Sequence, residues 1–338
     1  MIEKYFTIQY TALRTAGRYV YFSMYALLYA GCVSEAPVTI PSQIGEWSYF
    51  TASNSGLADD GISAIYQDED GAMWFGHDGA GLSLYKKGSF THYHTGNGLL
   101  SNVVYCITQD RDDDILVGTS QGLSFYQDGL WYYFAPLNGI PIRYLLQDND
   151  GNIWAGTTGY GILVYDGNDL IQVFDYDCAA CNDVYSIRQD HKGNIWFATY
   201  GGLKMFDGES INYYTTADGL ATNELYSLQE DSWGNIWIGP FEGDHLTRYH
   251  DGAFDALSLS NGASANPIFG WVTSIEQGDP GELWLGTYFF GLIHYDGAVM
   301  RRIFDGPPGD AITCLHKGID GAIWIGTSDN GVAKLVTD

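Results

Sequence analysis

Four side chains in this 338-residue sequence could serve acid–base catalysis: His77, Arg143, Glu242 and His245. A lyase or hydrolase needs a His, Tyr or carboxylate base, together with an Arg or a metal ion that neutralises developing charge. The four residues are scattered along the chain, and no spacing motif connects them. The sequence also lacks a nucleophile elbow, a phosphate-binding loop and zinc-ligand spacing. We therefore expect no metal and no cofactor, and we favour binding over catalysis.

A second group of side chains suits ligand binding. Aromatic rings can stack on sugar rings, while nearby charged and amide groups can bond to hydroxyls. The candidates are Arg143, Tyr160, Tyr200, Phe241, Asp244, Phe269, Trp271, Tyr288 and Phe289. They can form a site only if the fold brings their loops to one face.

The overall charge restricts the possible partners. The chain has 15 Lys and Arg against 41 Asp and Glu, a formal net charge of −26. Nucleic acids are held by Lys and Arg, so this balance argues against them as partners. It also disfavours direct attraction to an anionic membrane surface. The 43 glycines and the 15% aromatic content are typical of many short strands joined by tight turns.

Internal repeats predict the architecture. A motif of the form D-x-x-G-N-I-W-x-G recurs with Trp74, Leu116, Trp154, Trp196, Trp237, Trp284 and Trp324 at equivalent positions, 38 to 47 residues apart. Seven copies of this length are typical of a repeat protein in which each copy is one structural unit.

Each copy divides into four short segments in which apolar residues alternate with period two, separated by turn residues. Four antiparallel strands per copy predict an all-β fold, a seven-bladed β-propeller. A lone segment at 46–50 precedes the first copy, and the last copy has only three strands. We expect the N-terminal strand to complete the last blade as its outer strand and so to close the ring.

The repeated motif has a mechanical interpretation. The Asp can bond backbone amides of the turn, the Trp packs between blades, and the Gly after it lets backbones approach closely. Aspartate pairs such as Asp68 and Asp70 lack the other ligands of a calcium loop, so we interpret them as turn residues.

In such a ring, the loops between second and third strands share one face with the loops that link blades, and these loops carry the binding candidates. The longest linking loop, Ser258 to Trp271, is our best local candidate because long loops on a rigid scaffold are often functional. In the same blade, the segment Pro240 to His245 replaces the usual Gly-Thr-x-x-Gly.

The segment Val184 to Gly208, VYSIRQDHKGNIWFATYGGLKMFDG, resembles the two-component regulator propeller repeat, and copies of it cover about residues 46–338. The resemblance implies a sensor-type propeller like those of the periplasmic parts of bacterial hybrid histidine kinases, which are thought to bind saccharides or other small ligands. Because the sequence stops directly after the seventh copy with no kinase region, we expect no phosphotransfer by this chain on its own. Propeller lyases of the streptogramin type share the seven-blade layout, but a shared fold does not transfer chemistry.

The first residues are typical of an export signal. Lys4, Arg14 and Arg18 precede a weakly polar to apolar stretch, Tyr19 to Gly31, which is too short to span about 30 Å of hydrocarbon as a helix. Leu28 to Cys32 resembles the bacterial lipobox, implying acylation of Cys32, although Tyr29 stands where Leu is preferred. An ordinary cleaved signal, a retained anchor and a misassigned start remain alternatives. We predict an export signal at 1–31, a linker at 32–45 and the propeller at 46–338.

The other four cysteines are Cys106, Cys178, Cys181 and Cys314. Cys106 and Cys314 lie on predicted inner strands, as small buried thiols. For Cys178 and Cys181 we favour a local disulfide, as expected of an exported protein, over metal binding or redox chemistry.

The sequence therefore predicts an exported, non-catalytic propeller that binds a small molecule or an oligosaccharide, placed in the periplasm or, as a lipoprotein, at the outer membrane or cell surface. A polysaccharide or small-molecule lyase or hydrolase with its site on the same face is one alternative. A protein-interaction platform is the other. We expect no nucleic acid partner and membrane contact only through a lipid anchor; the sequence does not determine the oligomeric state.

Overall fold

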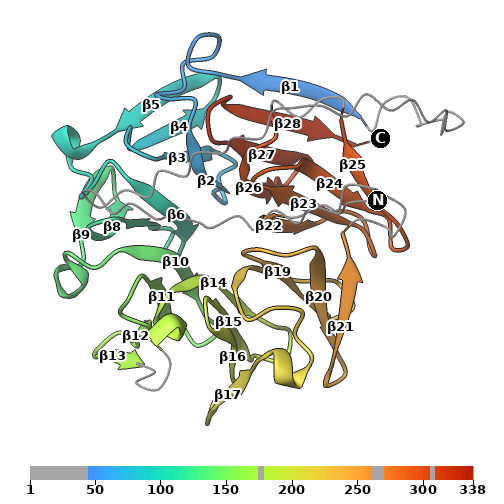
Figure 1. The fold of residues 1–338 in the computed structure, drawn as a ribbon. Coiled ribbons are helices and arrows are strands. Elements are labelled where there is room, and N and C mark those ends of the chain that lie inside the picture. The colour runs from blue at the N-terminus through green and yellow to red at the C-terminus, as the bar shows by residue number, and fades with distance from the viewer. Residues whose placement is uncertain (1–44, 174–178, 260–269, 305–308, 338) are drawn as a thin grey trace, which may run out of the picture. The chain divides into compact units, whose positions relative to one another are not determined.

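The computed structural model describes residues 45–173, 179–259, 270–304 and 309–337. In these residues seven four-stranded antiparallel sheets form the blades of a propeller. The first strand of each blade lies toward the centre of the ring and the fourth lies at its rim (Figure 1). The fold class predicted from the repeats is confirmed.

The first four blades follow the chain in order. Their strands are β2 (Ile62–Gln67), β3 (Met73–His77), β4 (Leu82–Lys86) and β5 (Ser89–Tyr93); β6 (Val104–Gln109), β7 (Ile115–Thr119), β8 (Gly122–Gln127) and β9 (Leu130–Tyr133); β10 (Ile142–Gln147), β11 (Ile153–Thr157), β12 (Ile162–Tyr165) and β13 (Leu170–Val173); and β14 (Val184–Gln189), β15 (Ile195–Thr199), β16 (Gly202–Phe206) and β17 (Ile211–Tyr214).

The remaining blades close the ring. Their strands are β18 (Leu225–Glu230), β19 (Ile236–Pro240), β20 (His245–His250) and β21 (Ala253–Ser258); β22 (Val272–Gln277), β23 (Leu283–Thr287), β24 (Gly291–Tyr295) and β25 (Met300–Ile303); and β26 (Ile312–Lys317), β27 (Ile323–Thr327) and β28 (Val332–Val336) with β1 (Glu46–Phe50). Short 3-10 helices η1 (Thr95–Asn97), η2 (Ala135–Leu137), η3 (Ala179–Asn182) and η4 (Thr216–Asp218) lie in linking loops. No helix in the described ranges is long and apolar enough to cross a membrane.

The N-terminal strand closes the ring as predicted. β1 pairs antiparallel with β28, with Trp47 opposite Leu335, so the seventh blade is built from both ends of the propeller. Trp47 also packs against the apolar cluster between the last two blades. This pairing covers the edge of β28, which would otherwise expose unpaired backbone groups.

The repeated Trp packs between blades. Trp196 of β15 is almost fully buried and joins an apolar cluster with Leu225 and Leu228 of the next blade. Close approach of the blades depends on the glycine that stands two residues after six of the seven Trp positions, with Ala198 in the remaining blade: a Cβ on Gly76 would lie only 2.6 Å from Val104 Cγ1 of the neighbouring blade. Both mechanical roles predicted for the motif are confirmed.

Every inner strand starts with an irregularity of register. In β14 the pairing with β15 shifts between Val184 and Ser186, and the other six inner strands shift at the same place. Such a bulge leaves the intervening residue outside the regular ladder and re-aims its side chain. In this fold the bulged residue is the second residue of each inner strand.

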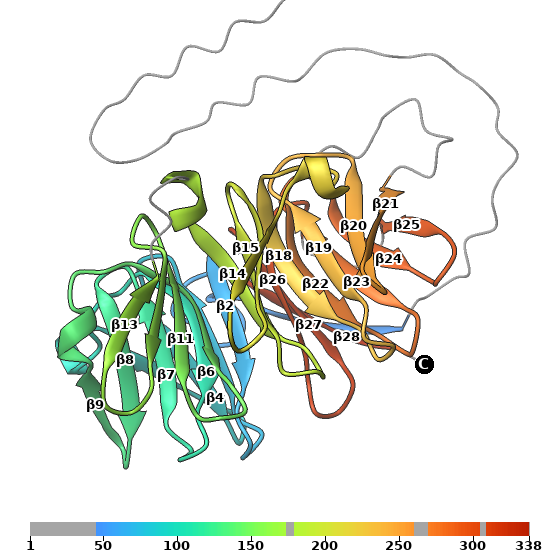
Figure 2. The same ribbon diagram turned by 90° about the horizontal axis from the view of Figure 1, so that it is seen from below.

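Figure 2 shows the blades from a direction at right angles to that of Figure 1, with the loops gathered at two opposite faces.

Candidate binding site at the mouth of the channel

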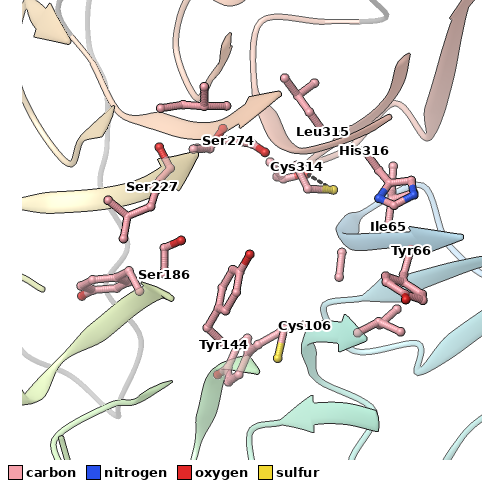
Figure 3. A pocket seen from close by; sticks show the side chains of 18 of the residues that line it. Ile65, Tyr66, Cys106, Tyr144, Ser186, Ser227, Ser274, Cys314, Leu315 and His316 are labelled. Atoms are coloured by element: carbon pink, nitrogen blue, oxygen red, sulfur yellow. Dashed lines mark hydrogen bonds between the residues drawn. The ribbon is translucent and has the colours of Figure 1, made fainter. Parts of the chain in front are cut away.

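The seven inner strands enclose a channel of about 410 Å³. Figure 3 shows side chains from different blades around it, among them Tyr144, which projects into the open space. At one end of the channel lies a connected pocket of about 250 Å³, the mouth. A pocket of a few hundred Å³ is of the size that holds a small molecule.

The bulged second residues of the inner strands all line this mouth. They are Ser63, Tyr105, Arg143, Tyr185, Tyr226, Thr273 and Thr313, and we call them the mouth ring. Residues from the loops between second and third strands, Asp78, Tyr288 and Ser328, line the same pocket, as does Trp271 just before β22. The predicted sharing of one face by the two sets of loops is thus seen at this pocket.

Seven rings form a continuous aromatic cluster over blades four to six. Trp271 is at its centre: its ring lies 4.3 Å from Phe241, 5.1 Å from Tyr288 and 5.9 Å from Phe289, and stacks on Tyr226 at 6.3 Å. Tyr226 stacks on Tyr185 at 5.1 Å, and Phe241 contacts Tyr200 edge-on at 5.3 Å. We call these seven residues the aromatic cluster.

Arg143 supplies the positive charge of the mouth. Its guanidinium lies 4.1 Å from the ring centroid of Tyr105, and its Nε–H donates a 3.0 Å hydrogen bond to Thr158 Oγ1. It is the only Lys or Arg among the described residues that line the mouth, and Asp78 is the only carboxylate. A single cation fixed by a ring and a hydroxyl can bind a carboxylate or hydroxyl oxygen of a ligand.

The polar groups of the mouth suit hydrogen bonding rather than proton abstraction. Burial raises the pKa of Tyr185 to about 12, and burial also raises the pKa of Tyr226. Their hydroxyls therefore stay protonated at neutral pH and can donate. The Oγ of Ser63 is buried and has no hydrogen-bond partner among the described residues, so it is available to a ligand in the mouth.

The structure brings six of the nine binding candidates together. Tyr200, Phe241, Trp271, Tyr288 and Phe289 belong to the aromatic cluster, and Arg143 shares the mouth with Trp271 and Tyr288.

The other three candidates are not part of this assembly. Tyr160 is exposed in the loop between β11 and β12 and lines neither the channel nor its mouth. Asp244 lies 2.5 Å from His245 Nδ1, in a pair away from the mouth lining. Phe269 lies outside the described residues.

The catalytic candidates are not gathered around Arg143. His77 is fully buried, with Nδ1 3.0 Å from the Gly61 carbonyl and Nε2 2.8 Å from Ser83 Oγ, and burial lowers its pKa. Glu242 is exposed at the tip between β19 and β20. None of the described residues lining the mouth is a histidine.

Six residues of the mouth ring were missed from sequence, and three of them are tyrosines: Tyr105, Tyr185 and Tyr226. They had a signal, the repeated V-Y-C, V-Y-S and L-Y-S triplets at the start of three inner strands. Plain alternation cannot reveal that the residue after the first apolar one lines the channel, because the bulge changes the direction of that side chain.

The cysteines form no metal centre in the described part of the chain, where no group of three or more potential ligands is found. Cys106 and Cys314 are free, and burial raises the pKa of each thiol to about 12, which disfavours the reactive thiolate. Cys181 is buried. Cys32 and Cys178 lie outside the described residues, so acylation and the Cys178–Cys181 disulfide remain predictions.

Solved structures with the same fold belong to several kinds of protein. The extracellular domain of a putative hybrid two-component system from B. thetaiotaomicron aligns with a TM-score of 0.74 and 22% identity, over 87% of this chain and 41% of that one. A catalytically inactive His-to-Ala variant of virginiamycin B lyase from Staphylococcus aureus, with quinupristin, gives 0.70 and 15%, over 87% and 99%. PorZ, a surface component of the type-IX secretion system of Porphyromonas gingivalis, gives 0.63 and 16%, over 85% and 48%. The chain thus spans about two fifths of the length of the two-component protein's domain.

No curated protein matches the chain. The model of the two-component regulator propeller family, in contrast, matches five segments: residues 56–79, 98–121, 136–159, 180–201 and 219–242. Each match runs through an inner strand and the strand after it, with the motif turn between them. The chain is therefore a seven-bladed propeller in which five blades carry a segment that matches the two-component regulator propeller repeat.

Proposed function

We propose that this propeller is a non-catalytic, sensor-like binding protein that holds a small molecule or an oligosaccharide at the mouth of its channel. One observation carries the proposal: seven aromatic rings from three blades form one cluster that opens onto a pocket with a fixed guanidinium. Exposed rings stack on the faces of sugars or aromatic ligands, and the surrounding hydroxyls and Arg143 give orientation.

A lyase is the second candidate, because the virginiamycin B lyase aligns over nearly its full length with this chain. That protein is inactivated by replacement of a histidine, whereas no described residue that lines the mouth is a histidine, and burial raises the pKa of two of its tyrosines, Tyr185 and Tyr226. Low sequence identity carries the fold and not the chemistry. The arrangement favours binding.

The experiment is a thermal-shift screen of the propeller against oligosaccharides, small carboxylates and divalent cations, since a ligand that binds the native state raises its melting temperature. Trp271→Ala removes the centre of the aromatic cluster and should abolish a sugar shift. Tyr160→Ala is the matched control, because Tyr160 is an exposed aromatic of a comparable loop outside the cluster. It should leave the shift unchanged.

The outcomes separate the candidates. A hit lost in Trp271→Ala and kept in Tyr160→Ala supports binding at the mouth. Consumption of the hit ligand, seen by mass spectrometry, would replace the binding proposal with an enzyme. Equal effects of the two changes would mean that the compound does not bind at the mouth, and no shift with any compound would move the function to a protein partner.

We also propose that the chain is exported and acylated at Cys32. The support is the lipobox-like segment Leu28 to Cys32 and the extracellular placement of the two-component relatives. Expression of the full chain in a bacterium with labelled palmitate should label the wild type and not Cys32→Ala. If neither protein is labelled and the exported protein lacks residues 1–31, the segment is an ordinary cleaved signal.

A further inference from the structure

A second ring of side chains lies deeper in the channel than the mouth ring. It consists of the fifth residue of each inner strand: Tyr66, Thr108, Leu146, Arg188, Gln229, Glu276 and His316. We call it the fifth-position ring. It differs from the mouth ring in carrying both signs of charge, Arg188 from blade four and Glu276 from blade six.

Arg188 has only neutral hydrogen-bond partners among the described residues. Its Nη2–H donates to Gln229 Oε1, and its Nε–H makes a long contact of 3.4 Å with the Leu228 carbonyl. No described carboxylate forms an ion pair with it. Because a guanidinium has five N–H donors and cannot be deprotonated in a protein, Arg188 keeps both a full charge and unused donors in the channel.

Glu276 is the complementary group. No described side chain donates a hydrogen bond to its carboxylate, and the nearby Lys317 directs its Nζ to the Gly278 carbonyl at 2.7 Å. Burial raises the pKa of Glu276 to about 7, whereas the charges of Arg188 and Lys317 and the Lys317 backbone N–H act in the opposite direction. The carboxylate therefore lines the channel without a cation bound to it.

The other titratable groups around the pair do not neutralise it. His316 of β26 accepts a 3.2 Å hydrogen bond from the Gln67 backbone N–H, and burial, with the charge of Arg188, lowers its pKa to about 4. It is neutral at physiological pH. Tyr144 of β10 and Glu230 of β18 also act on Arg188 electrostatically, and Glu230 bonds instead to His191 at 2.6 Å on the neighbouring turn.

We propose that the fifth-position ring binds a small zwitterion, a free α-amino acid, with its carboxylate on Arg188 and its ammonium group on Glu276. An anion alone would satisfy Arg188 and be repelled by Glu276, and a cation alone would do the reverse. A zwitterion gives each confined charge a counter-charge, and charge-assisted hydrogen bonds are the strong ones.

The remainder of the ring suits the ligand's side chain. Leu146 and the ring of Tyr66 give apolar surface within the same channel, whose volume of about 410 Å³ lies in the range of small-molecule sites. This site is independent of a ligand in the aromatic cluster, so the two proposals can fail separately.

The test is a thermal-shift screen of the propeller with each free L-amino acid, followed by calorimetric titration of the hits. Each hit is also titrated as its N-acetyl derivative, which lacks the ammonium group, and as its amide, which lacks the carboxylate. The free amino acid should bind at least about tenfold more tightly than either blocked form. Binding by no free amino acid, or equal binding of a blocked form, overturns the proposal.

Substitutions test whether the ligand binds in the fifth-position ring. Glu276→Gln and Arg188→Gln should each weaken binding by about tenfold or more. Glu209→Gln, which removes a charge from an exposed turn outside the channel, is the matched control and should bind as the wild type does. Trp271→Ala should also leave the amino-acid affinity unchanged, which distinguishes this site from the mouth.

The pH dependence provides a readout that needs no further variant. Because only the ionised Glu276 attracts an ammonium group, wild-type affinity should rise between about pH 6 and pH 8. Glu276→Gln should show no such rise. If Glu276→Gln folds and binds as tightly as the wild type at pH 8, the amino acid does not contact Glu276 and the proposal is wrong.

Discussion

The indole Nε1–H of Trp74 donates a 2.8 Å hydrogen bond to Oδ2 of Asp68, six residues earlier, and both side chains are buried. The other carboxylate oxygen, Oδ1, accepts the backbone N–H of Ala72 at 2.7 Å. One aspartate therefore fixes the turn between the first and second strands of the blade and orients the tryptophan that packs between blades. The same pairing occurs for Asp148 with Trp154, Asp190 with Trp196 and Asp231 with Trp237.

Replacing Asp68 should therefore destabilise the propeller. Asp68→Ala leaves the buried Trp74 indole N–H without its acceptor, and we expect a loss of about 2–3 kcal/mol in the free energy of unfolding. Denaturant unfolding measures it. Asp70→Ala is the control from the same turn: Asp70 is exposed and pairs with Lys86, and such surface pairs contribute about 0–1 kcal/mol. Equal losses of unfolding free energy in the two variants would show that the hydrogen bond from the Trp74 indole does not stabilise the propeller.

Much of the fold was predictable because its signal is repeated. The D-x-x-G-N-I-W-x-G motif appears in register in most copies, and four copies form the same indole bond between the Asp and the Trp. The closure by β1 followed from counting strands, since the last copy lacks one. Local patterns that agree with each other at every level specify a fold strongly.

The site was only partly predictable. Loop aromatics such as Phe241 and Trp271 could be found because they depart from the repeat, whereas Tyr185 and Tyr226 follow it. They line the mouth because each inner strand has a bulge, and the residue types in the strand do not predict that bulge. The shared place of Arg188 and Glu276 was also hidden, because residues 88 positions apart line one channel only when the blades form a ring.

Gly76, two residues after Trp74, should tolerate no side chain. Gly76→Ala would place a Cβ 2.6 Å from Val104 Cγ1 of the next blade, and we expect about 1–3 kcal/mol of destabilisation. The double change Gly76→Ala with Val104→Ala should cost less than the sum of the single changes, since the second truncation makes room for the first. Additive losses in chemical denaturation would instead mean that Gly76 acts through its backbone alone.

The pairing of β1 with β28 should be needed for a stable ring. Removal of residues 1–50 exposes the edge of β28 and uncovers the apolar cluster that Trp47 contacts. We expect a lower melting temperature and concentration-dependent association, measured by calorimetry and light scattering. Removal of residues 1–44 only, which keeps β1, is the control and should melt as the full propeller does. A stable monomer without β1 would show that closure of the ring contributes little.

Glu276 should make the stability of the propeller depend on pH. Burial raises the pKa of this carboxyl from 4.5 to about 7, so the folded protein holds the proton more tightly than the unfolded chain does. The stabilisation from protonated Glu276 is complete below about pH 4.5 and is lost as the pH rises through about 7. At about 1.4 kcal/mol per pKa unit, the loss is at most about 3.5 kcal/mol, and water in the channel reduces it. Glu276→Gln cannot ionise, so between pH 5 and pH 8 its unfolding free energy should fall less than that of the wild type, and at pH 8 the variant should be the more stable protein. Urea unfolding of both proteins across this range measures the difference. If the unfolding free energies of the two proteins change with pH in parallel, Glu276 is ionised throughout and Arg188 already neutralises it in the folded channel.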